Sequence, residues 1–333
     1  MSNRQPSPRG RGAAGNPPNR FDRITLERDP DWNPESDPAP RTQFLRDHSR
    51  TIIATNDSPD IPFRASVNPY RGCEHGCSYC YARITHEFLG FSAGIDFESK
   101  ILVKENAPEL LRKELMSPRW KPQLVAMSGV TDCYQPAERR FQLTRRCLAV
   151  LAEFRNPVAL ITKNHLVTRD IDLLRELASV NAVEVNISLN SLDAGLAARM
   201  EPRASQPAMR LAAIEALARA GIPVGVLVAP VIPAINDHEI PAVLRAAANA
   251  GARWAGTEIL RLPLNVAPVF VDWLEREFPD RKEKVLNRIR DIRGGKWNDA
   301  RFGSRMHGEG IHAEQISKMF HIARRKKPAR LRA

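Results

Sequence analysis

The segment "NPYRGCEHGCSYCYAR" (residues 68–83) places three cysteines within eight positions, with the spacing C-x3-C-x2-C. They are Cys73, Cys77 and Cys80, and the whole chain has five cysteines, so the remaining two do not form a second group of this kind. A disulfide would use two of the three thiols and leave the third unpaired. The spacing therefore favours a metal centre held by thiolates from one short loop.

Two kinds of metal centre are compatible with this loop. Structural zinc takes four protein ligands, usually as two separated pairs. His75 could be the fourth, but it lies inside the same loop, and no second cysteine pair follows. A 4Fe–4S cluster on three thiolates fits better, because its remaining iron stays open to another molecule. Gly72 and Gly76 would let the loop wrap closely, since glycine tolerates positive φ. A zinc knuckle or reduced structural cysteines remain alternatives.

Outward from this loop, apolar strand-like runs alternate with amphipathic stretches of helical spacing. Such alternation is typical of a parallel sheet covered by helices. The expected strands are 64–70, 123–129, 157–162, 182–190, 222–233 and 256–262, and the expected helices are 137–154, 168–180, 207–220 and 237–252. We therefore predict an α/β fold, a partial (β/α)6 TIM-like barrel, open or closed, whose ligands bind at the carboxyl ends of the strands.

The motif C-x3-C-x-aromatic-C, placed directly after the first strand of a βα repeat, resembles that of the radical S-adenosylmethionine (radical SAM) superfamily over about residues 60–265. The resemblance implies a 4Fe–4S cluster on Cys73, Cys77 and Cys80, bound S-adenosylmethionine, and a 5′-deoxyadenosyl radical. It also implies an electron donor such as flavodoxin or ferredoxin. Within the superfamily, "CEHGCSYCYAR" (73–83) and "TDCYQPAE" (131–138) are most similar to an uncharacterised branch of the spore photoproduct lyase and DNA repair photolyase-like group.

This resemblance also suggests side chains for radical chemistry. Tyr79 and Tyr81 flank the third cysteine, as do tyrosines implicated in hydrogen-atom relay in spore photoproduct lyase. For Tyr79, packing against the cofactor is the competing role. Cys133 follows the second strand, where that lyase has a cysteine hydrogen donor, but the matching position here is Gly129. Cys133 is therefore expected either to donate hydrogen from a shifted place or to be a packing residue, and Cys147 is expected in the core.

Candidate contacts to S-adenosylmethionine follow the next two strands. The superfamily usually has a Gly-Gly-Glu-like turn after the second strand, but this chain has "SGVTDCYQPAE" (128–138). The departure leaves Ser128, Thr131 and Asp132 as candidates, with a helix N-cap as the alternative for Asp132. After the third strand, Lys163 matches the lysine that contacts the methionyl carboxylate in spore photoproduct lyase. Its alternative is a solvated loop lysine.

The fourth strand, "VEVNISLNSLD" (183–193), has a polar face that requires partners if the strand is buried. The interior of a barrel that holds a ribose and a methionyl group would supply them. The residues of this face are Glu184, Asn186, Ser188 and Asn190, of which Ser188 and then Asn190 are the best candidates for ligand contacts. Beyond the strand, Arg203 is expected to pair with Glu201 or to reach the ligand.

The composition indicates where the protein works and what it binds. The chain has 333 residues, a formal net charge of +12 and no apolar run long enough to span a bilayer. The polar N-terminus lacks a signal-peptide pattern, and the cysteine usage suggests a reducing cytoplasm, with no membrane partner. Residues 280–333 carry 16 Lys/Arg against 6 Asp/Glu. This excess favours nucleic acid as a partner, because clustered cations contact phosphates.

We divide the chain into a disordered N-terminal segment (1–45), a radical SAM core (46–265), a helical C-terminal extension (266–322) and a basic tail (323–333). Side chains of the extension could stack on bases or pack over the open barrel edge: Trp297, Arg301, Phe302 and Arg305. The leading interpretation is a radical SAM enzyme, lyase-like or a repair enzyme on nucleic acid. The alternatives are a radical SAM enzyme that modifies RNA or a peptide, and a zinc-binding nucleic-acid adaptor without catalysis.

Overall fold

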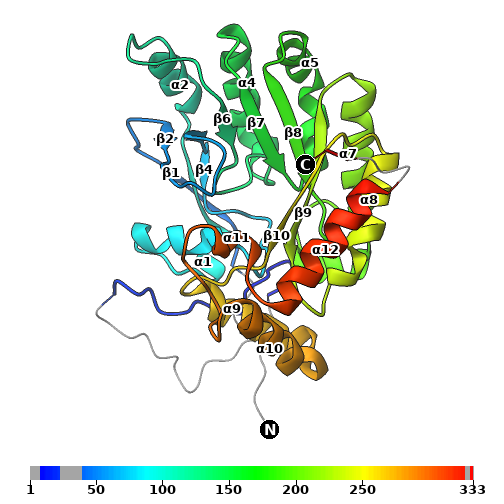
Figure 1. The fold of residues 1–333 in the computed structure, drawn as a ribbon. Helices are drawn as coiled ribbons and strands as arrows, with labels where there is room; N and C mark the ends of the chain where they lie inside the picture. The colour runs from blue at the N-terminus through cyan, green and yellow to red at the C-terminus, as the bar shows by residue number, and fades with distance from the viewer. Residues whose placement is uncertain (1–7, 23–39, 327–330, 333) are drawn as a thin grey trace.

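The computed structural model describes residues 8–22, 40–326 and 331–332, which form an α/β fold around a seven-stranded sheet (Figure 1). Neighbouring strands are parallel except β2 and β3, and the order is β10-β9-β8-β7-β6-β3-β2. The strands are β2 (Ile53–Thr55), β3 (Ala65–Val67), β6 (Val125–Met127), β7 (Val158–Thr162), β8 (Val183–Ser188), β9 (Val224–Val231) and β10 (Ala255–Ile259). The six parallel strands follow one another in chain order, which confirms the predicted partial barrel. Within the described ranges, β10 and β2 do not pair, so this barrel is open.

Helices cover the outer face of the sheet (Figure 1). The covering and connecting helices are α2 (Ala107–Leu115), α3 (Glu138–Phe141), α4 (Leu143–Glu153), η3 (His165–Asp170), α5 (Ile171–Ser179), α6 (Ala194–Met200), α7 (Pro207–Arg219), η4 (Asp237–Glu239) and α8 (Ile240–Asn249). Val125, Ala126 and Met127, which are consecutive in β6 and so point to alternate faces, are all fully buried. Burial on both faces explains why these strands are nearly continuous apolar runs in the sequence.

A second, three-stranded sheet lies beside the first and carries the cysteine loop. It has the order β1-β5-β4, with β1 (Gln43–Arg46), β4 (Tyr70–Arg71) and β5 (Lys100–Val103). Three short helices lie between β4 and β5: η1 (Tyr81–Thr85), η2 (Glu87–Leu89) and α1 (Ile95–Ser99). The sequence analysis did not predict this sheet, because strands of two to four residues give too few positions for a periodic pattern.

Residues 8–22 pack against the short helices and turns between β4 and β5, which differs from the expected disorder of residues 1–45. The backbone amides of Gly12 and Ala13 donate to the two carboxylate oxygens of the buried Glu98, at 3.0 and 2.9 Å. The Asn19 side chain donates to the Glu87 carbonyl at 2.9 Å. A segment with few apolar residues is held here by hydrogen bonds, which hydrophobicity does not reveal. Residues 40–45 are also described and enter β1 (Gln43–Arg46), whereas residues 1–7 and 23–39 lie outside the described residues.

The C-terminal extension is helical, and its last helix packs back on the barrel. It contains α9 (Val266–Glu277), η5 (Pro279–Arg281), α10 (Lys282–Ile292), α11 (Ser304–His307) and α12 (Ile311–Arg325). α12 lies against α8 (Figure 1). Beyond it, Leu331 is buried and Arg332 bridges to Trp254. The expected basic tail is therefore partly docked on the fold; residues 327–330 and 333 lie outside the description.

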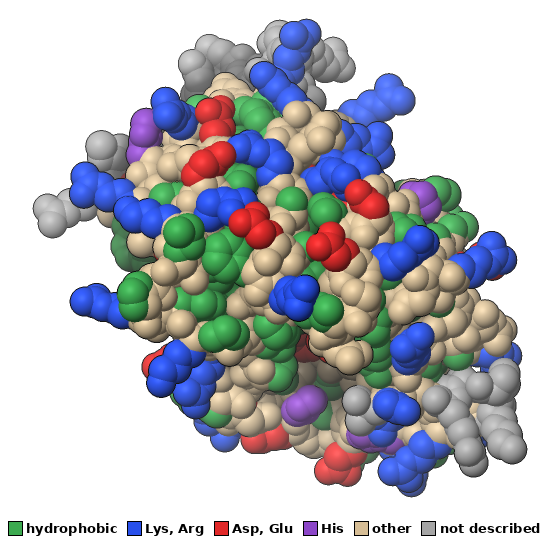
Figure 2. Space-filling view, turned by 90° about the horizontal axis from the view of Figure 1, so that it is seen from above, with side chains coloured by type: hydrophobic (Ala, Val, Ile, Leu, Met, Phe, Trp, Pro, Cys, Tyr) green, Lys and Arg blue, Asp and Glu red, His purple; other side chains and the backbone are tan. Residues whose placement is uncertain are grey.

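Charged side chains are spread over the surface. In Figure 2, Lys and Arg side chains are distributed across the whole face shown and alternate with Asp and Glu near its centre. This face has no continuous stripe of positive charge. No helix among the described residues is long and apolar enough to cross a membrane.

Candidate active site

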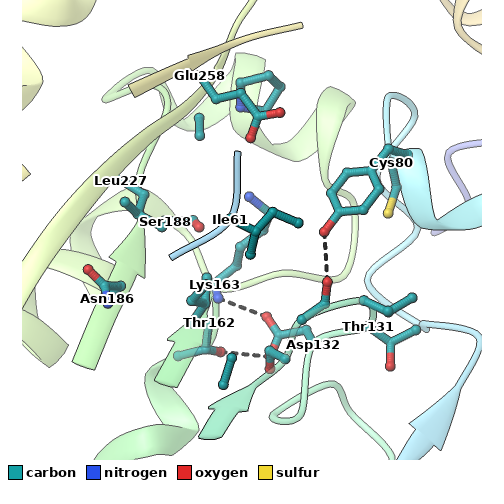
Figure 3. Close-up of a pocket in the computed structure, with 18 of the residues that line it drawn as sticks. Ile61, Cys80, Thr131, Asp132, Thr162, Lys163, Asn186, Ser188, Leu227 and Glu258 are labelled. Carbon is teal, nitrogen blue, oxygen red and sulfur yellow. Dashed lines mark hydrogen bonds between the residues drawn. The ribbon is translucent and has the colours of Figure 1, made fainter. Parts of the chain in front are cut away.

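A cavity of about 570 Å³ opens between the cysteine loop and the carboxyl ends of the parallel strands (Figure 3). Cys73, Cys77 and Cys80 all line it. The opposite wall comes from the ends of β6 to β10 and the residues that follow them, as expected for a parallel α/β barrel. Loop residues 60–63 and Arg305 with Met306 complete the lining.

The cysteine loop is held tightly from behind. Gly72 and Gly76 have φ values of 81° and 66°, so both take the positive-φ conformation expected of them. The buried Arg83 donates through Nε and Nη2 to the Cys77 carbonyl, at 3.0 and 2.8 Å, and also pairs with Glu98. Burial raises the pKa of the Cys77 thiol well above its usual range. A rigid loop with buried thiols facing a cavity fits a thiolate-bound cluster, because metal binding replaces the thiol protons.

His75, the proposed fourth zinc ligand, has other partners. Its Nδ1 lies 3.4 Å from an Asp132 carboxylate oxygen, and its Nε2 lies 3.2 Å from the Asn164 side-chain amide nitrogen. The contacts of His75 therefore favour a donor set of three thiolates in this loop.

Asp132 joins the ends of β6 and β7. Its carboxylate accepts hydrogen bonds from the Thr162 hydroxyl and the Lys163 amide, each at 2.8 Å (Figure 3). It also accepts one from the Tyr134 amide at 2.8 Å. Burial works against its ionisation, but the charge of His75 and these hydrogen bonds hold the pKa of Asp132 below its usual range. The next helix, α3, has Ala137 as its N-cap, so Asp132 does not take its alternative role of capping it. It fixes the backbone that carries Lys163.

The Lys163 side chain lines the cavity beside a buried ionic network. Its ammonium lies 3.3 Å from Glu201, whose carboxylate also accepts hydrogen bonds from the Tyr79 hydroxyl and the Arg210 guanidinium. Burial lowers the pKa of Lys163. Arg210 is almost fully buried and already neutralises Glu201, so the network as a whole keeps one positive charge, at the cavity wall. An anionic group of a ligand would complete it.

The family follows from comparison with known proteins. Residues 67–247 match the model of the Radical SAM superfamily. The chain belongs to this superfamily. An uncharacterised protein of Mycobacterium tuberculosis is 38% identical over 234 residues, which are 70% of this chain and 68% of that protein. An uncharacterised protein of Methanocaldococcus jannaschii is 29% identical over 222 residues, 67% of this chain and 79% of its own length.

Solved structures of spore photoproduct lyase share the fold. The lyase complexed with dinucleoside spore photoproduct matches with a TM-score of 0.61 and 18% identity, covering 86% of this chain and 80% of that chain. A double mutant of the lyase with bound AdoMet and dinucleoside spore photoproduct has a TM-score of 0.60 and 17% identity, covering 86% and 79%. Members of the radical SAM superfamily use a 4Fe–4S cluster and S-adenosylmethionine. The predicted family and fold are thus confirmed.

The remaining contacts predicted for the radical SAM cofactor divide into two groups. Ser128 and Ser188 line the cavity, and the Ser128 hydroxyl also accepts a hydrogen bond from the Cys133 amide at 2.7 Å. Asn190 and Arg203 are not among the lining residues. Asn190 instead donates to the Tyr79 hydroxyl at 3.2 Å, one layer behind the cavity wall.

Arg203 does not pair with Glu201, although the sequence allowed that pairing. Its guanidinium lies 3.1 Å from Glu74 and 3.3 Å from the Thr42 hydroxyl. Glu201 takes Arg210 instead, which the sequence analysis did not single out. The signal was present, because Arg210 shares the helical face of Ala213, Ile214 and Leu217, all buried. A cation on the apolar face of a helix requires a buried partner.

The three residues considered for radical chemistry have different surroundings. Tyr79 and Tyr81 line the cavity, and the Tyr81 hydroxyl donates to the Gly129 carbonyl at 3.0 Å. Cys133 is fully buried in the main hydrophobic core and is not among the lining residues. Cys147 is in the same core, as predicted. The surroundings of Cys133 are those of its alternative role, a packing residue.

Proposed function

We propose that this radical SAM enzyme holds a 4Fe–4S cluster on Cys73, Cys77 and Cys80, binds S-adenosylmethionine in the adjoining cavity and acts on nucleic acid. The observation that carries the proposal is that the three thiols and the Lys163 ammonium line the same cavity. A soft thiolate donor set suits an iron–sulfur cluster, and a buried cation beside it suits a carboxylate.

When bound, the reduced cluster and S-adenosylmethionine supply a 5′-deoxyadenosyl radical and methionine by one-electron cleavage of a carbon–sulfur bond. The chain's own residues bind and orient. Lys163 receives the methionyl carboxylate, and the Ser128 and Ser188 hydroxyls are placed for polar groups of the ligand. Leu227 and Ala229 on β9 offer apolar surface to the adenine. Tyr79, which belongs to the cysteine loop and lines the cavity, is held by its hydrogen bond to Glu201.

The nucleic-acid part of the proposal rests on charge, exposed aromatic side chains and likeness of fold. The positive charge of residues 280–333 favours phosphates. Trp297 and Phe302 are 36% and 61% exposed in the stretch before the cavity residues Arg305 and Met306, so they could stack on bases. Spore photoproduct lyase, which shares the fold, has been solved with a dinucleoside lesion.

We therefore propose a lyase or repair reaction, with DNA as the first substrate to screen and RNA or a peptide as the alternatives. The same proposal includes a cytoplasmic location, reduction by a flavodoxin or ferredoxin, residues 46–265 as the catalytic core and residues 266–322 as a helical extension.

Anaerobic reconstitution with iron and sulfide tests the proposal. Dithionite and S-adenosylmethionine are added, and 5′-deoxyadenosine is followed by chromatography. Wild type should form it and Cys77→Ala should not. Cys147→Ala, which removes a thiol from the core, should retain the activity. Wild type that holds iron but forms none with several reductants, or that holds only zinc, would contradict the proposal.

A further inference from the structure

Arg261 is a largely buried cation that makes no hydrogen bond to the described part of the chain. It follows β10 by two residues and lines the cavity, and its side chain is only 16% exposed. Its Nε lies 2.6 Å from Glu258 as an ion pair, but without the alignment of a hydrogen bond. Within the described part of the chain, no acceptor takes a hydrogen bond from this guanidinium. Its Nε is buried without an acceptor, and an unmet buried donor is costly.

Two other arginines at or near the cavity show the contrast. Arg305 donates to Asp60 at 2.5 Å and to the Ser58 hydroxyl. Arg210 donates to Glu201, to the Ser205 carbonyl and to the Ser188 carbonyl. Each is satisfied by its own chain. Arg261 is held in place, but its N–H donors have no hydrogen-bond acceptor in the described part of the chain.

What holds Arg261 also directs it toward the reaction site. Its guanidinium carbon lies 4.9 Å from the centre of the Tyr81 ring, and Tyr81 directly follows the third cluster cysteine. Tyr81 is itself tied to the end of β6 through the Gly129 carbonyl. Stacking on an aromatic ring and an ion pair on the Nε side restrain a guanidinium while its terminal nitrogens stay available.

We propose that Arg261 is a substrate-binding residue whose terminal nitrogens donate hydrogen bonds to a phosphodiester group of a nucleotide substrate. This inference rests on the proposed function and names the part of the substrate that the cavity recognises. Arginine's planar fork matches two phosphate oxygens, and phosphate contacts position a nucleic acid. The methionyl carboxylate of S-adenosylmethionine has its own cation in Lys163.

A pair of dinucleotides tests the proposal. Thymidylyl-thymidine has one phosphodiester charge, and its methylphosphonate analogue has the same shape without the charge. Their dissociation constants are measured by calorimetry on the anaerobically reconstituted protein. Wild type should prefer the charged dinucleotide by about tenfold or more, the size expected for hydrogen bonds to a charged group. Arg261→Gln should abolish the preference, and Arg261→Lys should keep part of it, since a lysine retains the charge without the fork.

Controls separate the outcomes. Arg219→Gln removes an exposed arginine on α7, away from the cavity, and should leave the preference unchanged. Affinity for S-adenosylmethionine, from equilibrium dialysis, should be the same in wild type and Arg261→Gln. The inference is overturned if wild type shows no preference for the phosphodiester, if Arg261→Gln retains it, or if that variant loses affinity for S-adenosylmethionine instead. A wild type without a cluster or S-adenosylmethionine binding would instead contradict the proposed function.

Discussion

Replacing Gly12 by alanine should undock the N-terminal segment from the cysteine loop. A Cβ atom at this position would lie 1.9 Å from the Gly76 carbonyl oxygen and 3.2 Å from the Ser78 amide nitrogen. Both atoms belong to the backbone of the loop that carries Cys77, so neither can swing aside as a side chain would. The segment must therefore move away, and its hydrogen bonds to Glu98 break.

The cost follows from the two amide–carboxylate hydrogen bonds of Gly12 and Ala13, at 3.0 and 2.9 Å. At about 1.5 kcal/mol for each hydrogen bond to a charged group, their loss costs about 3 kcal/mol. This free energy shifts the docking equilibrium about a hundredfold. Hydrogen exchange of residues 8–22, followed by mass spectrometry, should accelerate by about that factor in Gly12→Ala. Ala14→Ser, a small change in the same segment, should exchange as wild type does. Unchanged exchange in Gly12→Ala would refute this reasoning.

Three further predictions concern buried charge. Arg210→Met should lower the free energy of unfolding by about 3–5 kcal/mol in urea titrations, because the buried Glu201 loses its closest cation. Replacing both Arg210 and Glu201 by Met should restore part of this stability. Acidification should destabilise the cluster-free protein through His86, because burial lowers the pKa of this side chain from 6.5 to about 4. As the pH falls, the unfolded chain therefore binds the proton before the folded chain does, and the free energy of unfolding should drop by about 3 kcal/mol between pH 6.5 and 4. His86→Gln should remove that part of the pH dependence. Lys163→Ala should weaken S-adenosylmethionine binding by about tenfold or more in equilibrium dialysis, whereas Arg219→Ala should not.

The barrel could be predicted from the sequence because its strands are buried on both faces. Runs such as residues 222–233 are apolar nearly throughout, and helices of clear amphipathic spacing separate them. The cysteine loop was equally clear, since three thiols at this spacing have few uses. The alternating polar residues of the fourth strand were also expected to face the interior of the barrel, and one of them, Ser188, lines the cavity.

The contacts between distant segments could not be predicted in this way. Glu201 meets Tyr79, which is 122 positions away, and the Gly12 segment meets Glu98 across 86 positions. Such hydrogen bonds leave no periodic trace in a sequence, and a segment with few apolar residues is read as disordered even when buried carboxylates hold it. Cys133 shows the converse: its place after a strand suggested the cavity, but its side chain turns into the core.

The central claim is that Cys73, Cys77 and Cys80 hold a 4Fe–4S cluster whose remaining iron binds S-adenosylmethionine. The most direct measurement is the electron paramagnetic resonance spectrum of the anaerobically reconstituted, dithionite-reduced protein before and after S-adenosylmethionine is added, with iron and sulfide counted on the same sample. The account predicts about four irons and four sulfides per chain, and a reduced-cluster signal that changes when S-adenosylmethionine binds. Stoichiometric zinc, or a cluster whose signal is indifferent to S-adenosylmethionine, would contradict it.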